Sequence, residues 1–412
     1  MKNITAIRLL LLANFISGIA QGMSMIAVPL YFSTQGQSNW FGVAYMLITI
    51  VTLFWAPYAG TLVDKLNRKH IFIGLNIVIG LSIGSIALYG WVSGAMPPTL
   101  AALVFGLTFW NYGLHYPCFY AFMQEITEQE HYGKIASYIE VQSQLAAALA
   151  GAGASFLLIG GDYGWIVIDA WELHHVFAFD AMTYFVALGL ILFLKFVPIV
   201  ERHPEEGSTF DRLKAGFNYL KNEPYIFLFG IITYAPFVVV LMHVFNLSPI
   251  YVTNHLQEEG NVFAISELFY ALGATISGIA ILKIFRGISF VMAIIIMTIV
   301  TALQFLILMF SPWVWVFYLM SVLLGMTNSG VRVMRVSYLF KIVPNQVMGR
   351  ANGIFGVSNI LFRILFLGIF ALPFFHQSNN VIYAFLILTI FLMVSASILI
   401  TFYQKFILKN KS

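Results

Sequence analysis

The chain has 412 residues, of which 60% are hydrophobic and only 9% are charged. A soluble globular protein is typically about 45–50% apolar and about 25% charged. This composition excludes a soluble enzyme, a disordered protein and a nucleic-acid-binding protein, and it indicates a polytopic membrane protein. Cys118 is the only cysteine, which excludes an intrachain disulfide and a thiolate metal cluster. We expect neither a cofactor nor a bound metal ion.

Apolar runs along the chain are long enough to cross a bilayer as helices. A hydrocarbon core about 30 Å thick requires about 20 mostly apolar residues in a helix. The runs are continuously apolar, so the sequence predicts an all-α membrane protein with twelve transmembrane helices. The predicted spans are residues 8–32, 40–63, 71–93, 98–122, 134–160, 175–198, 225–252, 262–284, 287–311, 313–339, 349–372 and 379–404.

The lysines and arginines predict the orientation of these spans. If the N-terminus is cytoplasmic, the even-numbered connections are cytoplasmic too. All 21 basic residues other than Arg332, Arg335 and Arg363 then lie on the cytoplasmic side. The three exceptions lie within spans or at their ends. This is the positive-inside pattern, and it predicts a multi-pass protein of the cytoplasmic (inner) membrane with both termini inside.

The longest polar stretch lies between the sixth and seventh spans and divides the chain into two halves. We expect an N-terminal six-helix bundle over residues 1–198, a cytoplasmic linker over residues 199–224 and a C-terminal six-helix bundle over residues 225–412. Two six-span halves with both termini inside are typical of transporters whose bundles rock around a substrate near the middle of the membrane, but other families also have twelve helices.

The linker has a helical pattern of its own. Apolar residues recur at helical spacing with charged residues between them, at Phe210, Leu213, Phe217 and Leu220. This pattern predicts an amphipathic helix along the inner membrane face. Such a helix either tethers the two halves or offers a regulatory site.

A polar motif connects the second and third spans. From Gly60 to Lys69 the chain reads Gly-Thr-Leu-Val-Asp-Lys-Leu-Asn-Arg-Lys, which resembles the major facilitator superfamily signature Gly-x-Leu-x-Asp-Arg-x-Gly-Arg-Arg/Lys. Gly60 permits close helix packing, and Asp64 can pair with a basic group or a helix N-terminus to hold the bundles in one state. Arg68 and Lys69 anchor the inner face. Asn67 replaces a glycine, and we expect it to form the turn because asparagine tolerates a left-handed conformation.

Two further segments resemble one group within that superfamily, the macrolide-efflux and enterobactin exporters. Phe177–Tyr184 contains a Phe-x-x-Asp-Ala sequence with Asp180, and Val343-Pro344 is followed by Gly349-Arg350. The resemblance implies the major facilitator fold, a monomer and transport in the direction of export. One departure is that the stretch from Ala146 to Gly161 lacks the proline of the kink found in many antiporters.

Arginines within the spans are the first candidate binding residues. An arginine in a bilayer stays charged and requires an acid, carbonyl groups, water or an anionic substrate. Arg363 lies near the middle of the eleventh span, and Arg332 and Arg335 share one face of the tenth. We predict that Arg363 and Arg332 bind an anionic or carboxylate-bearing substrate, with a structural ion pair as the alternative. For Arg335, which lies near the inner end, a structural role such as extension to the headgroups is favoured over substrate binding.

Three acidic residues within the spans are candidate proton carriers: Glu140, Asp180 and Glu267. A carboxyl group in a transport pathway can alternate between its protonated and charged forms. Packing, capping or salt bridging is the alternative role for each. The sequence has no evident nucleotide-binding Walker motif, so we expect coupling to an ion gradient or to the gradient of the substrate.

Amides, aromatic residues and histidines complete the candidate substrate site. Such side chains suit a cavity that binds a moderately polar organic molecule. They are Asn14, Gln21, Trp110, Asn111, His115, Tyr116 and His243. The two histidines could instead be neutral hydrogen-bonded core groups. Their separation and the lack of cysteine partners argue against a metal site.

Together these features predict a secondary active transporter in the lipid bilayer. The leading hypothesis is proton-coupled export, as an antiporter, of a small organic molecule that is drug-like or anionic, such as a siderophore. One alternative is uptake of an anionic metabolite or siderophore. Another is a non-transporting membrane sensor or lipid-handling protein.

Overall fold

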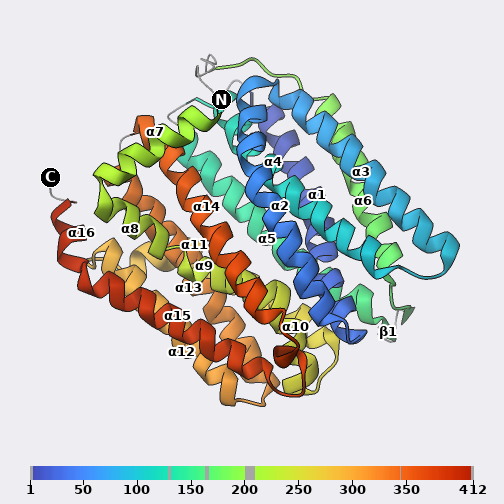
Figure 1. The fold of residues 1–412 in the computed structure, drawn as a ribbon. Helices are drawn as coiled ribbons and strands as arrows, with labels where there is room; N and C mark the ends of the chain where they lie inside the picture. The colour runs from blue at the N-terminus through green and yellow to red at the C-terminus, as the bar shows by residue number, and fades with distance from the viewer. Residues whose placement is uncertain (1–2, 129–130, 163–166, 200–208, 344, 410–412) are drawn as a thin grey trace. The chain divides into compact units, whose positions relative to one another are not determined.

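The computed structural model describes residues 3–128, 131–162, 167–199, 209–343 and 345–409, and these residues are almost entirely helical (Figure 1). The predicted all-α fold is confirmed. Within these ranges, ten segments are long and apolar enough to cross a membrane, and Ile354–Phe370 is a shorter apolar helix. Each predicted span falls on a helix or, for residues 225–252, on a series of helical pieces.

The chain divides into two compact units. The first comprises Met1–Gln37 and Ile50–Glu206, and the second comprises Ser38–Thr49 and Gly207–Ser412. The first part of helix α2 (Ser38–Lys65) therefore belongs to the second unit, although it lies in the N-terminal half of the sequence. The other elements of the first unit are α1 (Ile4–Thr34), α3 (Arg68–Ser93), α4 (Pro98–Glu125), α5 (Tyr132–Ile159), β1 (Gly161–Asp162), β2 (Val167–Ile168) and α6 (Leu173–Leu192).

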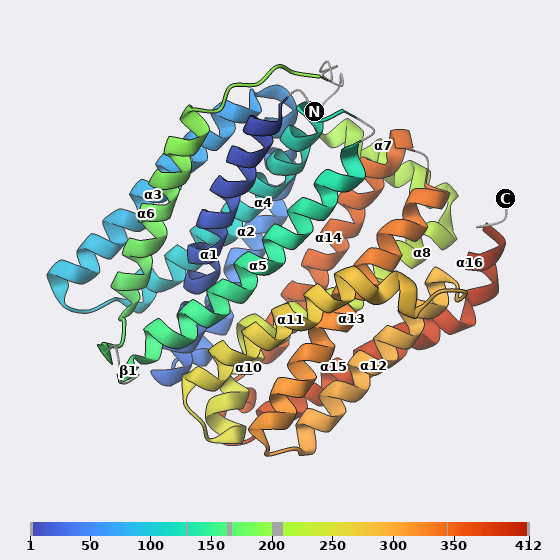
Figure 2. The same ribbon diagram turned by 180° about the vertical axis from the view of Figure 1, so that it is seen from behind.

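Helix α1 is central to the first unit, where it packs against α4, α5 and α6. Helices α3 and α6 lie side by side, as both views show (Figures 1 and 2). The two short strands form an antiparallel pair in which Gly161 faces Ile168. Pro98 begins α4 at a position where a helix needs no N–H group. Gly94 ends α3 in a left-handed conformation, with φ of 69°.

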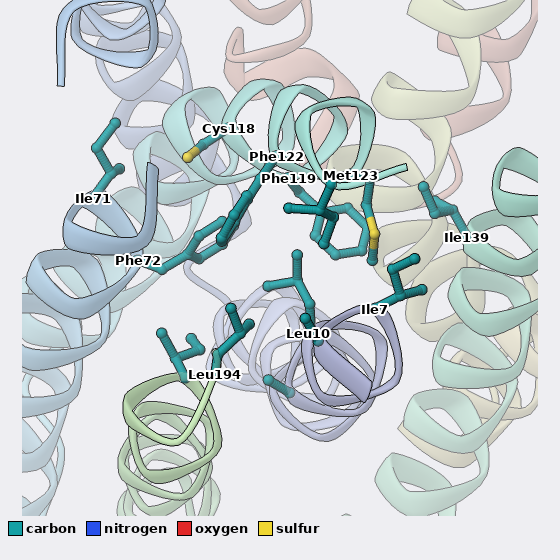
Figure 3. Close-up of a cluster of buried hydrophobic side chains, with 14 of the residues drawn as sticks. Ile7, Leu10, Ile71, Phe72, Cys118, Phe119, Phe122, Met123, Ile139 and Leu194 are labelled. Atoms are coloured by element: carbon teal, nitrogen blue, oxygen red, sulfur yellow. The ribbon is translucent and has the colours of Figure 1, made fainter. Parts of the chain in front are cut away.

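A hydrophobic cluster closes one end of the first unit (Figure 3). The ring of Phe72 from α3 stacks on Phe122 from α4, with centroids 6.2 Å apart. Side chains from α1, α2, α5 and the end of α6 and the residues after it complete the cluster, and Leu10, Ile139 and Leu194 are among them. Because the bilayer is itself apolar, such contacts stabilise the unit mainly through close packing.

The second unit contains the remaining helices. Helices α12 and α15 lie side by side in both views (Figures 1 and 2), and α11 packs tightly on α13. The elements are α7 (Thr209–Asn222), α8 (Pro224–Ile232), α9 (Ala235–Met242), the π-helical η2 (His243–Leu247), α10 (Ser248–Ile250), the π-helical η3 (Tyr251–Leu256), α11 (Gly260–Ile284), α12 (Phe290–Phe310), α13 (Val314–Ile342), α14 (Asn345–Phe370), the 3-10 helix η4 (Pro373–His376), α15 (Val381–Thr401) and α16 (Tyr403–Lys409).

Small residues explain the close approach of α11 and α13. A β-carbon on Gly273 would collide with the carbonyl group of Val322, and one on Gly325 would collide with the carbonyl group of Tyr270. Each glycine therefore lets the backbone of one helix touch the other, which is a common form of helix packing in membranes.

The seventh span differs from the single helix expected over residues 225–252. It begins at Pro224, is interrupted at Thr233 and Tyr234, and continues as α9, η2, α10 and η3. Pro236 and Pro249 lie within it, and proline disrupts helical hydrogen bonding because it has no N–H group. The span therefore consists of short helical pieces with two π-helical segments.

Helix α7 lies within the predicted linker, where the spacing of apolar residues indicated a helix. Leu220 is fully buried, whereas Phe217 is exposed. The side chains of Phe210 and Leu213 lie outside the described part of the structure. Helix α7 packs against α14 in the same unit.

Candidate functional site

Arg363 on α14 is deeply buried in the second unit. Its side chain is 5% exposed, and its Nη2 atom donates hydrogen bonds to Tyr45 Oη at 3.2 Å and to Thr49 Oγ1 at 3.4 Å. The Thr49 hydroxyl donates in turn to the Tyr45 carbonyl group at 2.8 Å, so its oxygen is free to accept from the arginine. These oxygens belong to neutral groups. A carboxylate makes a stronger and bidentate partner for a guanidinium group.

Both partners of Arg363 come from the first turns of α2. Gly42, Tyr45 and Thr49 are three and four residues apart, so they lie on one face of that helix. The rings of Tyr45 and Phe245 meet edge to face with centroids 6.2 Å apart. This arrangement of α2, η2 and α14 was not predicted, because the residues that meet are more than 190 positions apart in the sequence.

The two arginines of the tenth span have different surroundings. Arg332 is exposed on α13. Arg335 is buried, and its guanidinium carbon lies 3.7 Å above the ring of Tyr234, which forms a cation–π contact. This contact gives Arg335 a structural role within the second unit, as the sequence favoured. Tyr234 lies where the seventh span is interrupted, so Arg335 stabilises that interruption.

His243 lies in the π-helical segment η2 and is buried within the second unit. Its ring packs against Phe305, Phe317 and Phe385, with centroids 5.2 to 6.2 Å away. Its Nε2 atom lies 3.3 Å from Ser248 Oγ. These surroundings are those of a core histidine.

Asp180 on α6 is completely buried in the first unit. Its Oδ2 atom accepts a hydrogen bond from Ser24 Oγ of α1 at 2.7 Å, whereas its Oδ1 atom has no hydrogen-bond partner within the described residues. One turn further along α6, the Tyr184 hydroxyl accepts a hydrogen bond from Asn111 Nδ2 of α4 at 3.3 Å. Helices α1, α4 and α6 thus carry a polar cluster inside the bundle.

His115 and Asn14 were both predicted site residues, and the structure brings them together. His115 Nε2 lies 2.6 Å from Asn14 Oδ1, and Asn14 Nδ2 donates to Gln142 Oε1 of α5 at 2.7 Å. A cavity of about 10 Å³, close to the size of one water molecule, lies beside them. Its polar lining includes Ser17 and Asn76 as well.

The other predicted residues of the first unit lie around this cluster. Gln21 is buried on α1, and its Nε2 atom has no hydrogen-bond partner in the described part of the chain. The rings of Tyr116 and His115 have centroids 5.4 Å apart. Trp110 is half-buried, and its carbonyl group accepts a hydrogen bond from Trp55 Nε1 at 2.9 Å.

The motif between α2 and α3 anchors one end of the first unit. Arg68 Nη1 forms an ion pair with Glu125 Oε2 of α4 and donates to the Ala121 carbonyl group, both at 2.8 Å. Lys69 Nζ donates to the carbonyl groups of Leu192 and Leu194 at the end of α6. The positive charge there is favourable, because a helix C-terminus carries partial negative charge.

Asn67 acts differently from the expectation of a left-handed turn. Its φ is −66°, and its side chain caps α3 by accepting hydrogen bonds from the backbone N–H groups of Lys69 and His70. Asparagine is a favoured N-cap residue because its side-chain oxygen satisfies N–H groups that have no partner in the helix.

Several predictions fall on side chains outside the described part of the structure. The backbones of Gly60 and Asp64 lie in α2 and that of Glu140 lies in α5. Glu267 is half-buried on α11. Sequence reasoning missed Tyr45, Thr49, Ser24, Gln142 and Glu125. The first four are polar residues within apolar spans, but this signal alone does not single out hydroxyl-bearing residues, which are common there.

Two compact units of long apolar helices, each with buried polar groups in its interior, define a polytopic membrane protein. The sequence matches the Major Facilitator Superfamily over residues 10–366, and the chain belongs to this superfamily. Macrolide efflux protein A from Enterococcus faecalis is 22% identical over 251 residues, which cover 57% of this chain and 71% of that protein.

Solved transporter structures share the fold. The POT family transporter PepTSo aligns with a TM-score of 0.75 at 11% identity and covers 98% of each chain. The D-xylose–proton symporter aligns with a TM-score of 0.70 at 13% identity and covers 97% of each chain. The nucleoside transporter NupG aligns with a TM-score of 0.67 at 14% identity, over 97% of this chain and 99% of that chain. At these identities the similarity concerns the fold alone.

Proposed function

We propose that this transporter exports a small organic anion from the cell in exchange for protons. The observation that carries the proposal is the burial of Arg363 against two neutral hydroxyl groups, those of Tyr45 and Thr49. A buried guanidinium group in a bilayer is costly unless it serves a function. In this proposal the oxygens of a carboxylate substrate accept hydrogen bonds from the guanidinium group of Arg363, which now donates to the two hydroxyl groups.

Asp180 is the proposed proton carrier. It is fully buried, and one of its carboxyl oxygens has a hydroxyl donor while the other has no partner among the described residues. A proton on that second oxygen neutralises the carboxyl group when the site is closed from water. Glu267 and Glu140 are further candidates for the same role.

The similarity to a macrolide efflux protein supports export as the direction. A drug-like substrate is therefore a second candidate, and it would be exported by the same alternating access. Uptake of an anionic metabolite or siderophore would use Arg363 equally well, and direction must be measured. The geometry gives no comparable support for a sensor.

Comparative metabolite profiling tests the class of substrate and the direction of transport in one experiment. Cells with and without the chain are grown under iron starvation, and both the cells and the medium are analysed. The proposal predicts that without the chain a carboxylate-bearing compound accumulates inside and disappears from the medium. Depletion inside with accumulation outside would show uptake instead. No change in any anionic compound would contradict the proposal and direct attention to drug toxicity screens.

A further inference from the structure

Asn246 is a buried polar residue that has no assigned role in the proposed function. Its side chain is 3% exposed and lies in the π-helical segment η2. Neither Oδ1 nor Nδ2 has a hydrogen-bond partner within the described part of the chain. A buried amide without partners is unfavourable, so its presence calls for an explanation.

The position of Asn246 connects it to Arg363. A β-carbon on Gly42 would lie 3.4 Å from Asn246 Nδ2, so this amide lies against α2 at Gly42. Arg363 bonds to Tyr45 and Thr49, which continue the same face of α2. Gly42 and Tyr45 are separated by about one helical turn, or about 5 Å along the axis. The amide and the guanidinium group therefore face the same strip of α2.

The local backbone supports a functional reading of this placement. Asn246 lies in the first of the two π-helical segments of the broken seventh span. Single turns of π-helix occur frequently at functional sites, because the wider turn changes the direction of side chains. Because Gly42 has no side chain, the amide lies directly against α2, where a β-carbon on Gly42 would also contact Ala371.

We propose that Asn246 is the second anchor of the substrate and that the substrate carries an amide group close to its carboxylate. The carboxylate binds Arg363. The substrate amide pairs with Asn246, whose side chain offers one acceptor and two donors, so both partnerless atoms are satisfied at once. The neighbouring rings of Phe245 and Tyr45 suit an apolar or aromatic substituent. This inference rests on the proposed function of Arg363 and specifies the class of its substrate as N-acyl amino acids and related amido acids.

Three matched probes test the proposal on the purified full-length protein in detergent. Hippurate has a carboxylate and an amide, 3-benzoylpropionate replaces the amide N–H by a methylene group, and methyl hippurate masks the carboxylate. Apparent affinities are obtained from the rise in melting temperature with probe concentration. We expect the wild type to bind hippurate about tenfold more tightly than 3-benzoylpropionate, because one buried hydrogen bond is lost. Methyl hippurate should bind weakly.

Two variants test the amide anchor Asn246 and the carboxylate anchor Arg363 separately. Asn246→Leu should bind the two carboxylate probes equally, because hippurate loses both hydrogen bonds to the asparagine. Its affinity for 3-benzoylpropionate should fall less, because that probe loses only the bond from Nδ2 to its ketone oxygen. Arg363→Gln should lose affinity for both carboxylates. Asn218→Leu on the exposed face of α7 is the control and should behave as the wild type. The melting temperature of ligand-free Asn246→Leu should not fall, because the substitution removes a polar group without partners; a purely structural asparagine would lower it.

The outcomes distinguish this inference from the function on which it rests. If Asn246→Leu retains the preference for hippurate, the amide anchor is overturned while the carboxylate site stands. If methyl hippurate binds as tightly as hippurate and Arg363→Gln changes nothing, the carboxylate site itself is wrong. If neither carboxylate binds to the wild type, the substrate class proposed here is wrong.

Discussion

Arg68 at the start of α3 and Glu125 at the end of α4 form an ion pair in which Nη1 and Oε2 are 2.8 Å apart. The glutamate is 6% exposed and the arginine 16% exposed, so water screens the pair only weakly. The same Arg68 atom also bonds to the Ala121 carbonyl group. The motif that identifies the superfamily thus holds α3 and α4 together within the first unit.

Removal of this pair should destabilise the first unit. We expect Arg68→Gln and Glu125→Gln each to lower the free energy of unfolding by about 1–3 kcal/mol, because each leaves a largely buried charge without its partner. The double variant should cost less than the sum of the two single variants. Thermal unfolding of the purified protein in detergent measures the cycle, with the exposed Arg286→Gln as the control. Additive effects would mean that the two side chains do not interact.

The close contact of α11 and α13 leads to a second prediction. Gly273→Ala places a methyl group against the Val322 carbonyl group, so the helices must separate. We expect a loss of stability of about 1–3 kcal/mol from this overpacking. Gly278→Ala on the same helix is the matched control, because nothing lies within 4 Å of its β-carbon position. The control should be neutral or slightly stabilising, since alanine favours helices over glycine. Equal melting temperatures for the two variants would contradict the described crossing.

Proton coupling through Asp180 predicts a change in pH response. Asp180→Asn can still accept the hydrogen bond from Ser24, so the fold should persist, but the amide cannot bind and release a proton. We expect the export rate of the compound found by profiling to vary with external pH in the wild type and to become independent of pH in the variant. Glu258→Gln, an exposed carboxylate, is the control. A pH response that survives in Asp180→Asn would exclude this residue as the carrier.

His376, in the short η4 helix outside the spans, predicts an acid-sensitive contribution to stability. Its Nε2 atom lies 2.8 Å from the Phe370 carbonyl group, and burial lowers the pKa of His376 below its ordinary value of 6.5. The unfolded chain therefore binds this proton more readily, so the stability contributed here is lost as pH falls below about 6.5. His376→Gln should reduce the fall in melting temperature on acidification. The exposed His70→Gln is the control, and an equal effect of both variants would contradict the assignment.

The all-α fold could be predicted from the sequence because each membrane span is one continuous run of apolar residues. The break in the seventh span at Thr233 and Tyr234 was missed, since hydropathy alone does not distinguish a continuous helix from a series of short helical pieces. Asn67 was recognised as a departure from the signature, but its role as an N-cap depends on φ and ψ angles that composition does not give.

The candidate site was predictable only in part. Arg363 stands out in the sequence because a charge in an apolar run is rare and costly. Its partners Tyr45 and Thr49 do not stand out, because hydroxyl-bearing residues are common in spans and lie more than 300 positions away. Asn246 also lies within an apolar span, but the lack of hydrogen-bond partners for its amide among the described residues is visible only in the folded chain.

The central claim is that Arg363 binds the exported anion, and metabolite profiling tests it most directly. Cells that produce Arg363→Gln are compared with cells that produce the wild type. The exposed variant Arg286→Gln is the control, and all three proteins are present at matched levels in the membrane. The account predicts that Arg363→Gln behaves like the absence of the chain, with an anionic compound retained inside and at least about tenfold less of it in the medium. A medium indistinguishable from that of the wild type would show that Arg363 does not bind the substrate.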